Sequence, residues 1–221
     1  MNGIHRYFDD ELKQLKEQIL RMGKLVQDQI AHAIQALIER NVDLARQTIA
    51  NDHQVNAMDV AIDESCIRLL ALYQPEARDL RFITTAMKIT TDLERMSDLS
   101  EDICERAIEL TNEPQANSYK DIARGAIYAQ KMVKEALDAF VNQDVQLARK
   151  VCADDQFIDD LTDQIFRDLL TGMIADPGAV SRKIRLSFIA KYLERIGDHA
   201  TNLAEMVVYL VEGKMIRHTQ V

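Results

Sequence analysis

The stretch Leu193–Asp198 reads LERIGD, and Leu93–Asp98, which lies 100 residues earlier, reads LERMSD. A further match, at an offset of 103 residues, places Leu44–Arg46 on Leu147–Arg149, and both of these segments read LAR. Self-similarity at a fixed offset is typical of a repeated structural unit. The chain is therefore interpreted as two copies of one unit, the second of which is about three residues shorter in a loop.

The residues between the matching blocks indicate where helices begin and end. The three prolines, Pro75, Pro114 and Pro177, fall between the periodic segments, where helices are expected to end. Strand signals are missing, since aromatic residues make up 5% of the chain and no stretch alternates apolar and polar residues for long. The pattern predicts six helices, at residues 9–39, 43–73, 78–111, 119–141, 145–173 and 180–212, with Asn or Asp capping residues in the breaks at 41–43 and 142–144.

The connections between these helices are short, which forces neighbouring helices to run antiparallel. Each set of three is therefore expected to form an up-down-up bundle. The predicted fold is all-α, with two tandem three-helix bundles related by internal duplication. The bundles are predicted to occupy residues 1–113 and 114–221.

The chain carries 27 basic and 36 acidic residues, for a net charge of −9. Such a surface argues against nucleic acid or an anionic membrane as a partner, because phosphate binding needs clustered Lys and Arg, and it suits cations. The acidic start lacks the apolar core of a signal peptide, and the apolar run Met206–Val211 is too short to cross a bilayer. Cys66, Cys104 and Cys152 are odd in number and widely spaced, as expected of free thiols in a reducing cytosol. A cytoplasmic protein is expected.

Acidic side chains recur one helical turn apart at equivalent places in the two copies. Like charges at positions i and i+4 destabilise a helix by about a few tenths of a kcal/mol, so their presence in both copies indicates that something positive neutralises them. The second and third helices of each unit are antiparallel neighbours, so their acidic rows are expected to face each other. The candidate metal ligands are Glu94, Asp98, Asp102, Asp52 and Asn56 in the first copy, and Glu194, Asp198, Asn202, Asp155 and Asp159 in the second.

Oxygen ligands, with no Cys and few His, favour a hard divalent ion such as Mg²⁺, Mn²⁺ or Ca²⁺, with iron as a further option. The small residues Ser97 and Gly197 would let a neighbouring backbone or ligand come close. The alternative interpretation is a solvated helix face. Arg95 and Arg195 directly follow Glu94 and Glu194, but adjacent positions point apart on a helix and are not expected to pair.

Several of these segments together resemble the PhoU family of phosphate-uptake regulators. LERIGD at Leu193–Asp198 and LERMSD at Leu93–Asp98 are similar to the doubled LERIGD motif of that family, and Gln74–Arg81 is similar to its QP-x-A-x-DLR segment. Asp52 followed by Val-Asn and then Ile-Asp resembles a further family helix, and Met22-Gly23 resembles an early Met-Gly pair. The resemblance extends from about residue 10 to the end of the last helix.

The resemblance implies two symmetric three-helix bundles in a cytoplasmic, often dimeric protein, so a homodimer is expected. It implies a negative regulator of phosphate uptake and of the phosphate-starvation response, which links the ATPase of a phosphate ABC transporter to a sensor histidine kinase and meets the membrane only through these partners. It also implies divalent metal at the E-x-x-x-D motifs. The sequence departs from the family at Ser97, where Gly is usual, and at Asn56 and Asn202, where Asp would ligate better, so unequal metal affinities are expected in the two copies.

Three other functions are weighed against this one. A di-metal carboxylate enzyme needs Glu-x-x-His on its helices, which none of the five histidines provides, and no Gly-rich phosphate loop or nucleophile elbow is present, so the chain is not expected to be an enzyme. Histidine phosphotransfer through His199 is disfavoured because Glu194, Asp198 and Glu205 would repel phosphate, and a solvated or partner-facing His199 is expected instead. A metal-free helical scaffold is retained as an alternative function.

Overall fold

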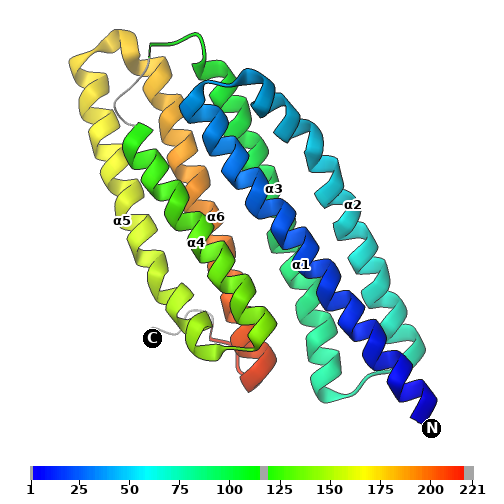
Figure 1. The fold of residues 1–221 in the computed structure, drawn as a ribbon. Helices are drawn as coiled ribbons and strands as arrows, with labels where there is room; N and C mark the ends of the chain where they lie inside the picture. Colours follow the sequence, from blue (N-terminus) through cyan, green and yellow to red (C-terminus); the bar gives the residue numbers. More distant parts are fainter. Residues whose placement is uncertain (1, 115–118, 217–221) are drawn as a thin grey trace.

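The computed structural model describes residues 2–114 and 119–216, where the chain forms six long α-helices (Figure 1). They are α1 (Asn2–Glu39), α2 (Val42–Tyr73), α3 (Ala77–Leu110), α4 (Tyr119–Asn142), α5 (Val145–Ala175) and α6 (Val180–Glu212), and a short 3₁₀ helix η1 (Pro177–Ala179) precedes α6. The predicted all-α fold of two three-helix bundles is confirmed. The boundary between residues 113 and 114 stays a prediction, and residues 115–118 and 217–221 of the second predicted bundle lie outside the described residues.

The first helix begins earlier than expected, at Asn2 rather than at residue 9. The reason is tertiary packing beyond the predicted start. The ring of Phe8 lies 4.8 Å, between centroids, from the ring of Tyr73 at the end of α2, and Phe8 is buried there. This contact gives the first turns of α1 a partner that local periodicity does not reveal.

The same turn joins the first and second helices of each bundle. Asn41 accepts a hydrogen bond from the backbone N–H of Leu44 at 3.0 Å, and Asp144 accepts one from that of Leu147 at 3.0 Å. The residue before each cap is left-handed, with φ of 56° at Arg40 and 53° at Gln143. Side-chain capping of this kind satisfies backbone donors that the first helical turn leaves unpaired. The predicted caps are therefore in place, and the duplication extends to backbone geometry.

The two bundles lie side by side and meet along two helix pairs, α3 with α6 and α1 with α4, while α2 and α5 lie at the outer edges and pack only within their own bundles (Figure 1). We call this contact the interbundle junction. At Gly23 the two helices α1 and α4 approach closely, since a Cβ there would lie 2.6 Å from Cδ1 of Leu137. The core is continuous across the junction, because buried Leu, Ile, Met and Ala side chains of both bundles form one cluster.

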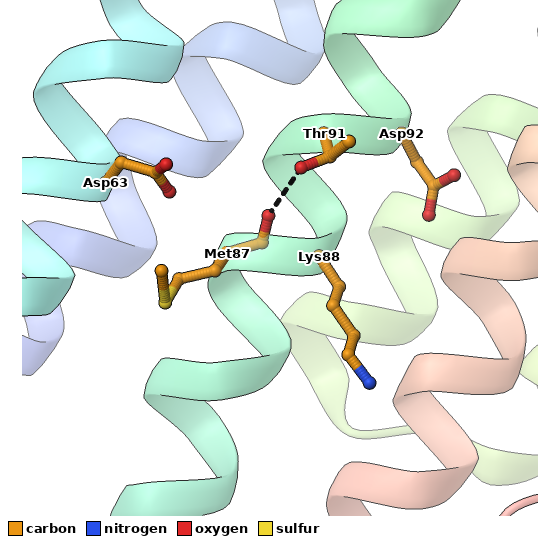
Figure 2. Close-up of a pocket in the computed structure, with 5 residues that line it drawn as sticks. All are labelled: Asp63, Met87, Lys88, Thr91 and Asp92. Carbon is orange, nitrogen blue, oxygen red and sulfur yellow. Dashed lines mark hydrogen bonds between the residues drawn. The ribbon is translucent and has the colours of Figure 1, made fainter.

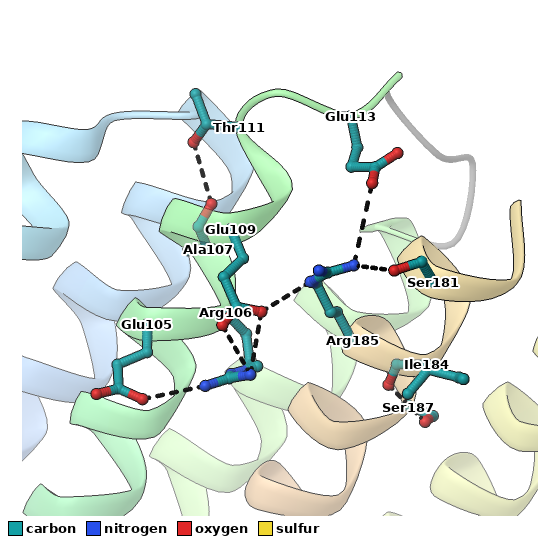
Figure 3. Close-up of polar contacts among 10 residues, drawn as sticks. All are labelled: Glu105, Arg106, Ala107, Glu109, Thr111, Glu113, Ser181, Ile184, Arg185 and Ser187. Carbon is teal, nitrogen blue, oxygen red and sulfur yellow. Dashed lines mark hydrogen bonds and ion pairs between the residues drawn. The ribbon is translucent and has the colours of Figure 1, made fainter.

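One end of the junction is closed by charged pairs between the bundles. Arg185 of α6 donates to the carboxylate of Glu109 in α3 at 2.7 Å and lies 4.0 Å from Glu113 (Figure 3). Arg106 of α3 lies 2.9 Å from the other oxygen of Glu109, so one carboxylate joins two arginines. Exposed pairs are worth at most about 1 kcal/mol each, so they orient the bundles more than they hold them together.

The three cysteines are free thiols, as predicted: Cys66 and Cys104 are buried, and Cys152 is half-buried. Burial raises the pKa of Cys66 and of Cys104 to about 12 and that of Cys152 to about 11. The thiols are therefore protonated and unreactive at neutral pH. Among the described residues, no helix is both long and apolar enough to cross a bilayer.

Candidate metal sites

Four carboxylates from α5 and α6 act electrostatically on one another in the second bundle. Burial, together with the charges of Asp159, Asp198 and Glu194, raises the pKa of Asp155 to about 6, while the Thr201 hydroxyl acts to lower it. Burial also raises the pKa of Asp159 and of Asp198, and Glu194 is the leading like charge acting on each. The two rows predicted to face each other are thus in electrostatic contact. We call these four residues, Asp155, Asp159, Glu194 and Asp198, the second acidic site.

One oxygen of the second acidic site lacks a donor. Oδ1 of Asp155 is shielded from solvent and accepts no hydrogen bond, and Oγ1 of Thr201 is near enough to lower the pKa without completing one. Gly197 keeps the space beside this oxygen open, because a Cβ there would lie 3.0 Å from Ile158 and 3.7 Å from Oδ1 of Asp155. A buried acceptor without a donor costs about 1–3 kcal/mol, which a bound cation would relieve.

The equivalent place in the first bundle is filled by hydrogen bonds. Oδ1 of Asp52 accepts from the hydroxyl of Ser97 at 2.5 Å, and Oδ2 of Asp52 accepts from the amide of Asn56 at 2.7 Å. Oε1 of Gln29 on α1 also lies 2.5 Å from the Ser97 oxygen and is a second acceptor for the same hydroxyl. Because Ser97 stands where the second bundle has Gly197, and Asn56 where it has Asp159, both oxygens of Asp52 already have donors.

In the first bundle, the side chain of Arg95 contacts two of the predicted carboxylate ligands. Nη1 of Arg95 is 3.2 Å from Asp98, and its Nε is 3.5 Å from Glu94. The expectation that Arg95 would not pair was wrong, because the long guanidinium side chain folds back between two carboxylates one turn apart. In the second bundle the corresponding cation is Lys191, whose Nζ lies 2.5 Å from Glu194.

Asn202 does not lie with the row that was predicted to contain it, and the place of Asp102 among the ligands stays a prediction. Asn202 donates to Asp92 of α3 at 3.3 Å, across the interbundle junction. Burial and the charges of Glu105 and Asp98 raise the pKa of Asp102, while Arg106 and Arg195 lower it, so Asp102 lies near both its own row and α6. The reason is helix geometry: each step of four residues turns the side chain by about 40°, so the third member of an i, i+4, i+8 row has rotated toward the neighbouring bundle.

His199 also faces the junction, so the expectation of a solvated side chain was wrong, while that of a partner-facing one stays a prediction. Its Nδ1 lies 2.9 Å from Oδ1 of Asp92, and its side chain is 17% exposed. Asp92 further lines an open hollow of about 390 Å³ with Asp63, Met87, Lys88 and Thr91 (Figure 2). None of these residues belongs to the second acidic site, so this hollow is separate from it.

Two acidic residues that were not predicted, Asp59 and Glu101, lie near the predicted ligands of the first bundle. Burial raises the pKa of Asp59 and of Glu101, and the charge of Asp52 also acts on Glu101. Each lies seven residues after a predicted ligand, Asp59 after Asp52 and Glu101 after Glu94, a spacing of two helical turns that could have identified both. The buried Gln29 carried no such signal, because it reaches Ser97 from another helix. Within residues 2–114 and 119–216, no three His, Cys, Asp or Glu side chains are already arranged to hold a metal ion.

A model of the PhoU domain matches residues 19–107 and 122–207 of the chain. The chain belongs to the PhoU family. The two matched segments fall in the two bundles, so the PhoU domain corresponds to one three-helix unit and its duplication to the internal repeat.

PhoU relatives match over nearly the whole chain. The phosphate-specific transport system accessory protein PhoU homolog of Aquifex aeolicus is 44% identical over 211 residues and covers 96% of each chain. The accessory protein PhoU of Escherichia coli is 35% identical over 218 residues, covering 97% of this chain and 89% of that one. These relatives are accessory proteins, in agreement with the prediction that the chain is not an enzyme.

Solved PhoU structures share the arrangement of both bundles. PhoU from Pseudomonas aeruginosa superposes with a TM-score of 0.91 at 42% identity, covering 94% of this chain and 100% of that one. The phosphate transport system regulatory protein PhoU from Streptococcus pneumoniae superposes with a TM-score of 0.88 at 29% identity, covering 94% and 98%.

The raised pKa of Asp155 predicts a pH-dependent stability. Its ionised form is penalised in the folded state, so without metal its contribution to the free energy of unfolding falls as pH rises from 3.8 to about 6 and stays low above that. Asp155→Asn should therefore stabilise the metal-free protein at pH 7.5 by about 1 kcal/mol, after discounting for solvent screening. Near pH 4 the difference should vanish. Urea unfolding with a chelator at both pH values measures this, with the exposed Asp163→Asn as control. Equal stabilisation at both pH values would contradict it.

Proposed function

We propose that the chain is a PhoU-type accessory protein that negatively regulates phosphate uptake and the phosphate-starvation response. In this role it acts in the cytoplasm, as a homodimer, as an adaptor between the ATPase of a phosphate ABC transporter and a sensor histidine kinase. The observation that carries the proposal is the match to PhoU accessory proteins along 96–97% of the chain, through both bundles. An adaptor needs surfaces and a stable scaffold, and the duplicated bundle supplies both.

The proposal includes a hard divalent ion at the second acidic site. Its four carboxylates fit such an ion, because their like charges oppose one another and Oδ1 of Asp155 lacks a donor. Lys191 supplies one positive charge beside Glu194, and the ion would supply the remainder. Asp155 and Asp159 from α5, with Glu194 and Asp198 from α6, would hold it.

The second acidic site is proposed to bind the ion more tightly than its first-bundle counterpart. In the first bundle, donors from Ser97 and Asn56 already satisfy Asp52. Arg95 contacts both Glu94 and Asp98 and would repel a second cation there, whereas Lys191 of the second bundle contacts Glu194 alone among the four carboxylates. In the second bundle, loss of the ion would leave repulsion between α5 and α6, which loosens their packing. A partner that docks on α5 and α6 would then sense whether the ion is bound.

The role of the second acidic site is tested by gene expression. In a strain lacking the protein, the wild-type chain should restore repression of a phosphate-starvation reporter in high phosphate. The double variant Glu194→Gln/Asp198→Asn should fail to do so at equal protein abundance. The matched control Glu94→Gln/Asp98→Asn makes the same two changes in the first bundle and should retain most of the repression.

A metal-free helical scaffold is the second candidate, and the lack of a preformed ligand cluster among the described residues favours it. Under this alternative, both double variants repress the reporter as well as the wild type. That outcome would reject the ion while leaving the adaptor role intact. Failure of the wild-type chain itself to restore repression would reject the adaptor role.

A further inference from the structure

A cavity of about 270 Å³ lies at the interbundle junction and is lined from both bundles. Lys13 and Lys16 of α1 and Arg78 of α3 line it from the first bundle, while Gln143 and Leu210 line it from the second. Asp79, in the first turn of α3, is the acidic residue of its wall. Three cations therefore surround one cavity in a protein whose net charge is −9.

Two of these cations donate to neutral acceptors. Nζ of Lys16 donates to the backbone carbonyl of Val141 at 2.6 Å, and Nη2 of Arg78 donates to the side-chain oxygen of Gln143 at 2.8 Å. Both acceptors are neutral and both belong to the second bundle. Across the part of the chain that the structure describes, none of Lys13, Lys16 and Arg78 forms an ion pair with a carboxylate.

The far end of the same junction shows the opposite arrangement. There Arg185 and Arg106 are paired with Glu109, and Arg106 also lies 3.1 Å from Glu105 (Figure 3). Positive charge at the junction is thus paired with carboxylates at one end, while at the other end Asp79 offsets one of three cations. The start of α3 adds to the positive end, because Glu76 makes no side-chain cap there and the helix dipole is positive at its N-terminus.

Part of the cavity lining is apolar and well packed. Leu12, Phe82 and Leu210 form it. The ring of Phe82 stacks on Phe140, with centroids 5.9 Å apart, and Leu210 and Phe140 are buried. The cavity therefore presents both cationic groups and a well-packed apolar surface.

We propose that this cavity binds a small organic phosphate, a phosphomonoester whose phosphoryl group contacts Lys13, Lys16 and Arg78 and whose apolar part lies on Phe82. Three cations and Asp79 leave a net charge of about +2, which matches the charge of about −1.5 to −2 on a phosphomonoester at neutral pH. Lys and Arg donors suit phosphate oxygens, and Arg does so in a bidentate manner. Because the lining comes from both bundles, the bound ligand would also hold the junction together.

The proposal is tested by titrating the full-length, chelator-treated protein with phenyl phosphate, inorganic phosphate and benzoate. Removing metal ensures that no phosphate binds through an ion at the acidic sites, so the result does not depend on the proposed ion. Binding is followed by calorimetry and by the ¹H–¹⁵N signal of the Gln143 side-chain amide. Phenyl phosphate should bind most tightly, inorganic phosphate more weakly because it does not use the apolar wall, and the monoanion benzoate most weakly.

Variants locate the binding. Lys13→Gln removes an exposed charge for which no hydrogen bond is seen among residues 2–114 and 119–216, and it should weaken phenyl phosphate binding by about tenfold. Arg78→Gln should weaken it at least as much. The control Lys134→Gln removes the same charge from an exposed position on α4 and should change the affinity by less than about twofold.

Four outcomes would overturn the proposal: no binding of phenyl phosphate, tighter binding of inorganic phosphate, equal binding of benzoate, or equal weakening by Lys134→Gln and Lys13→Gln. A thermal unfolding scan of each variant without ligand separates loss of binding from loss of folding. Since Lys13 is exposed, its variant should unfold at the wild-type temperature.

Discussion

Phe140→Ala is expected to lower the free energy of unfolding by about 3–5 kcal/mol. Phe140 is 1% exposed and lies at the end of α4, where its ring stacks on Phe82 of α3. Truncation removes the transfer free energy of the ring and leaves a cavity that helices anchored on both sides cannot close. Because the ring touches both bundles, the change should destabilise their association as well as the second bundle.

Urea unfolding followed by circular dichroism measures the effect. The control is Phe188→Ala, which makes the same truncation at a side chain that is 47% exposed on α6. Its expected cost is about 1 kcal/mol or less, because much of that ring is already in water. Similar costs for the two variants would contradict the described packing at the junction.

Glu194→Gln/Asp198→Asn is expected to weaken Mn²⁺ binding at the second acidic site by at least about a hundredfold. Loss of an outer-shell partner alone costs about 10–100-fold in metal affinity, and here two charged ligands are replaced by neutral ones. The same changes remove like charges that oppose Asp155 and Asp159, so the metal-free variant should be no less stable than the wild type.

Calorimetry and the electron paramagnetic resonance of free Mn²⁺ measure this affinity. The matched variant Glu94→Gln/Asp98→Asn should leave the tighter binding event unchanged, since Asp52 is already satisfied by protein donors. If that variant abolishes the tighter binding event and the second-bundle variant does not, the proposed ranking of the two sites by metal affinity is wrong. If the wild type binds no divalent ion, the ion is rejected altogether.

Local sequence signals predicted the helices well. Prolines and the Asn or Asp caps act within a few residues of the chain, and the capping bonds of Asn41 and Asp144 formed where they were expected. The start of α1 was misplaced, because Phe8 gains its partner Tyr73 from another helix. Boundaries supported by capping were therefore predictable, and a boundary supported by packing was not.

The candidate sites were predicted in part, for a similar reason. Asp155, Asp159, Glu194 and Asp198 converge because antiparallel neighbours must present their rows to each other, which topology alone implies. The contacts of Asn202 and His199 with Asp92 depend on how one bundle is rotated against the other.

By itself the sequence determined the all-α class, the duplication, the helix limits set by caps and the pairing of acidic rows within each bundle. The tertiary structure alone decided that both oxygens of Asp52 are satisfied while one oxygen of Asp155 is not, and that Lys13, Lys16 and Arg78 share one cavity. The physical reason is the distance along the chain over which each interaction acts. Periodicity and capping act over a few residues, whereas side-chain donors, burial and the approach of unpaired charges depend on helices that only the packing of the two bundles brings together.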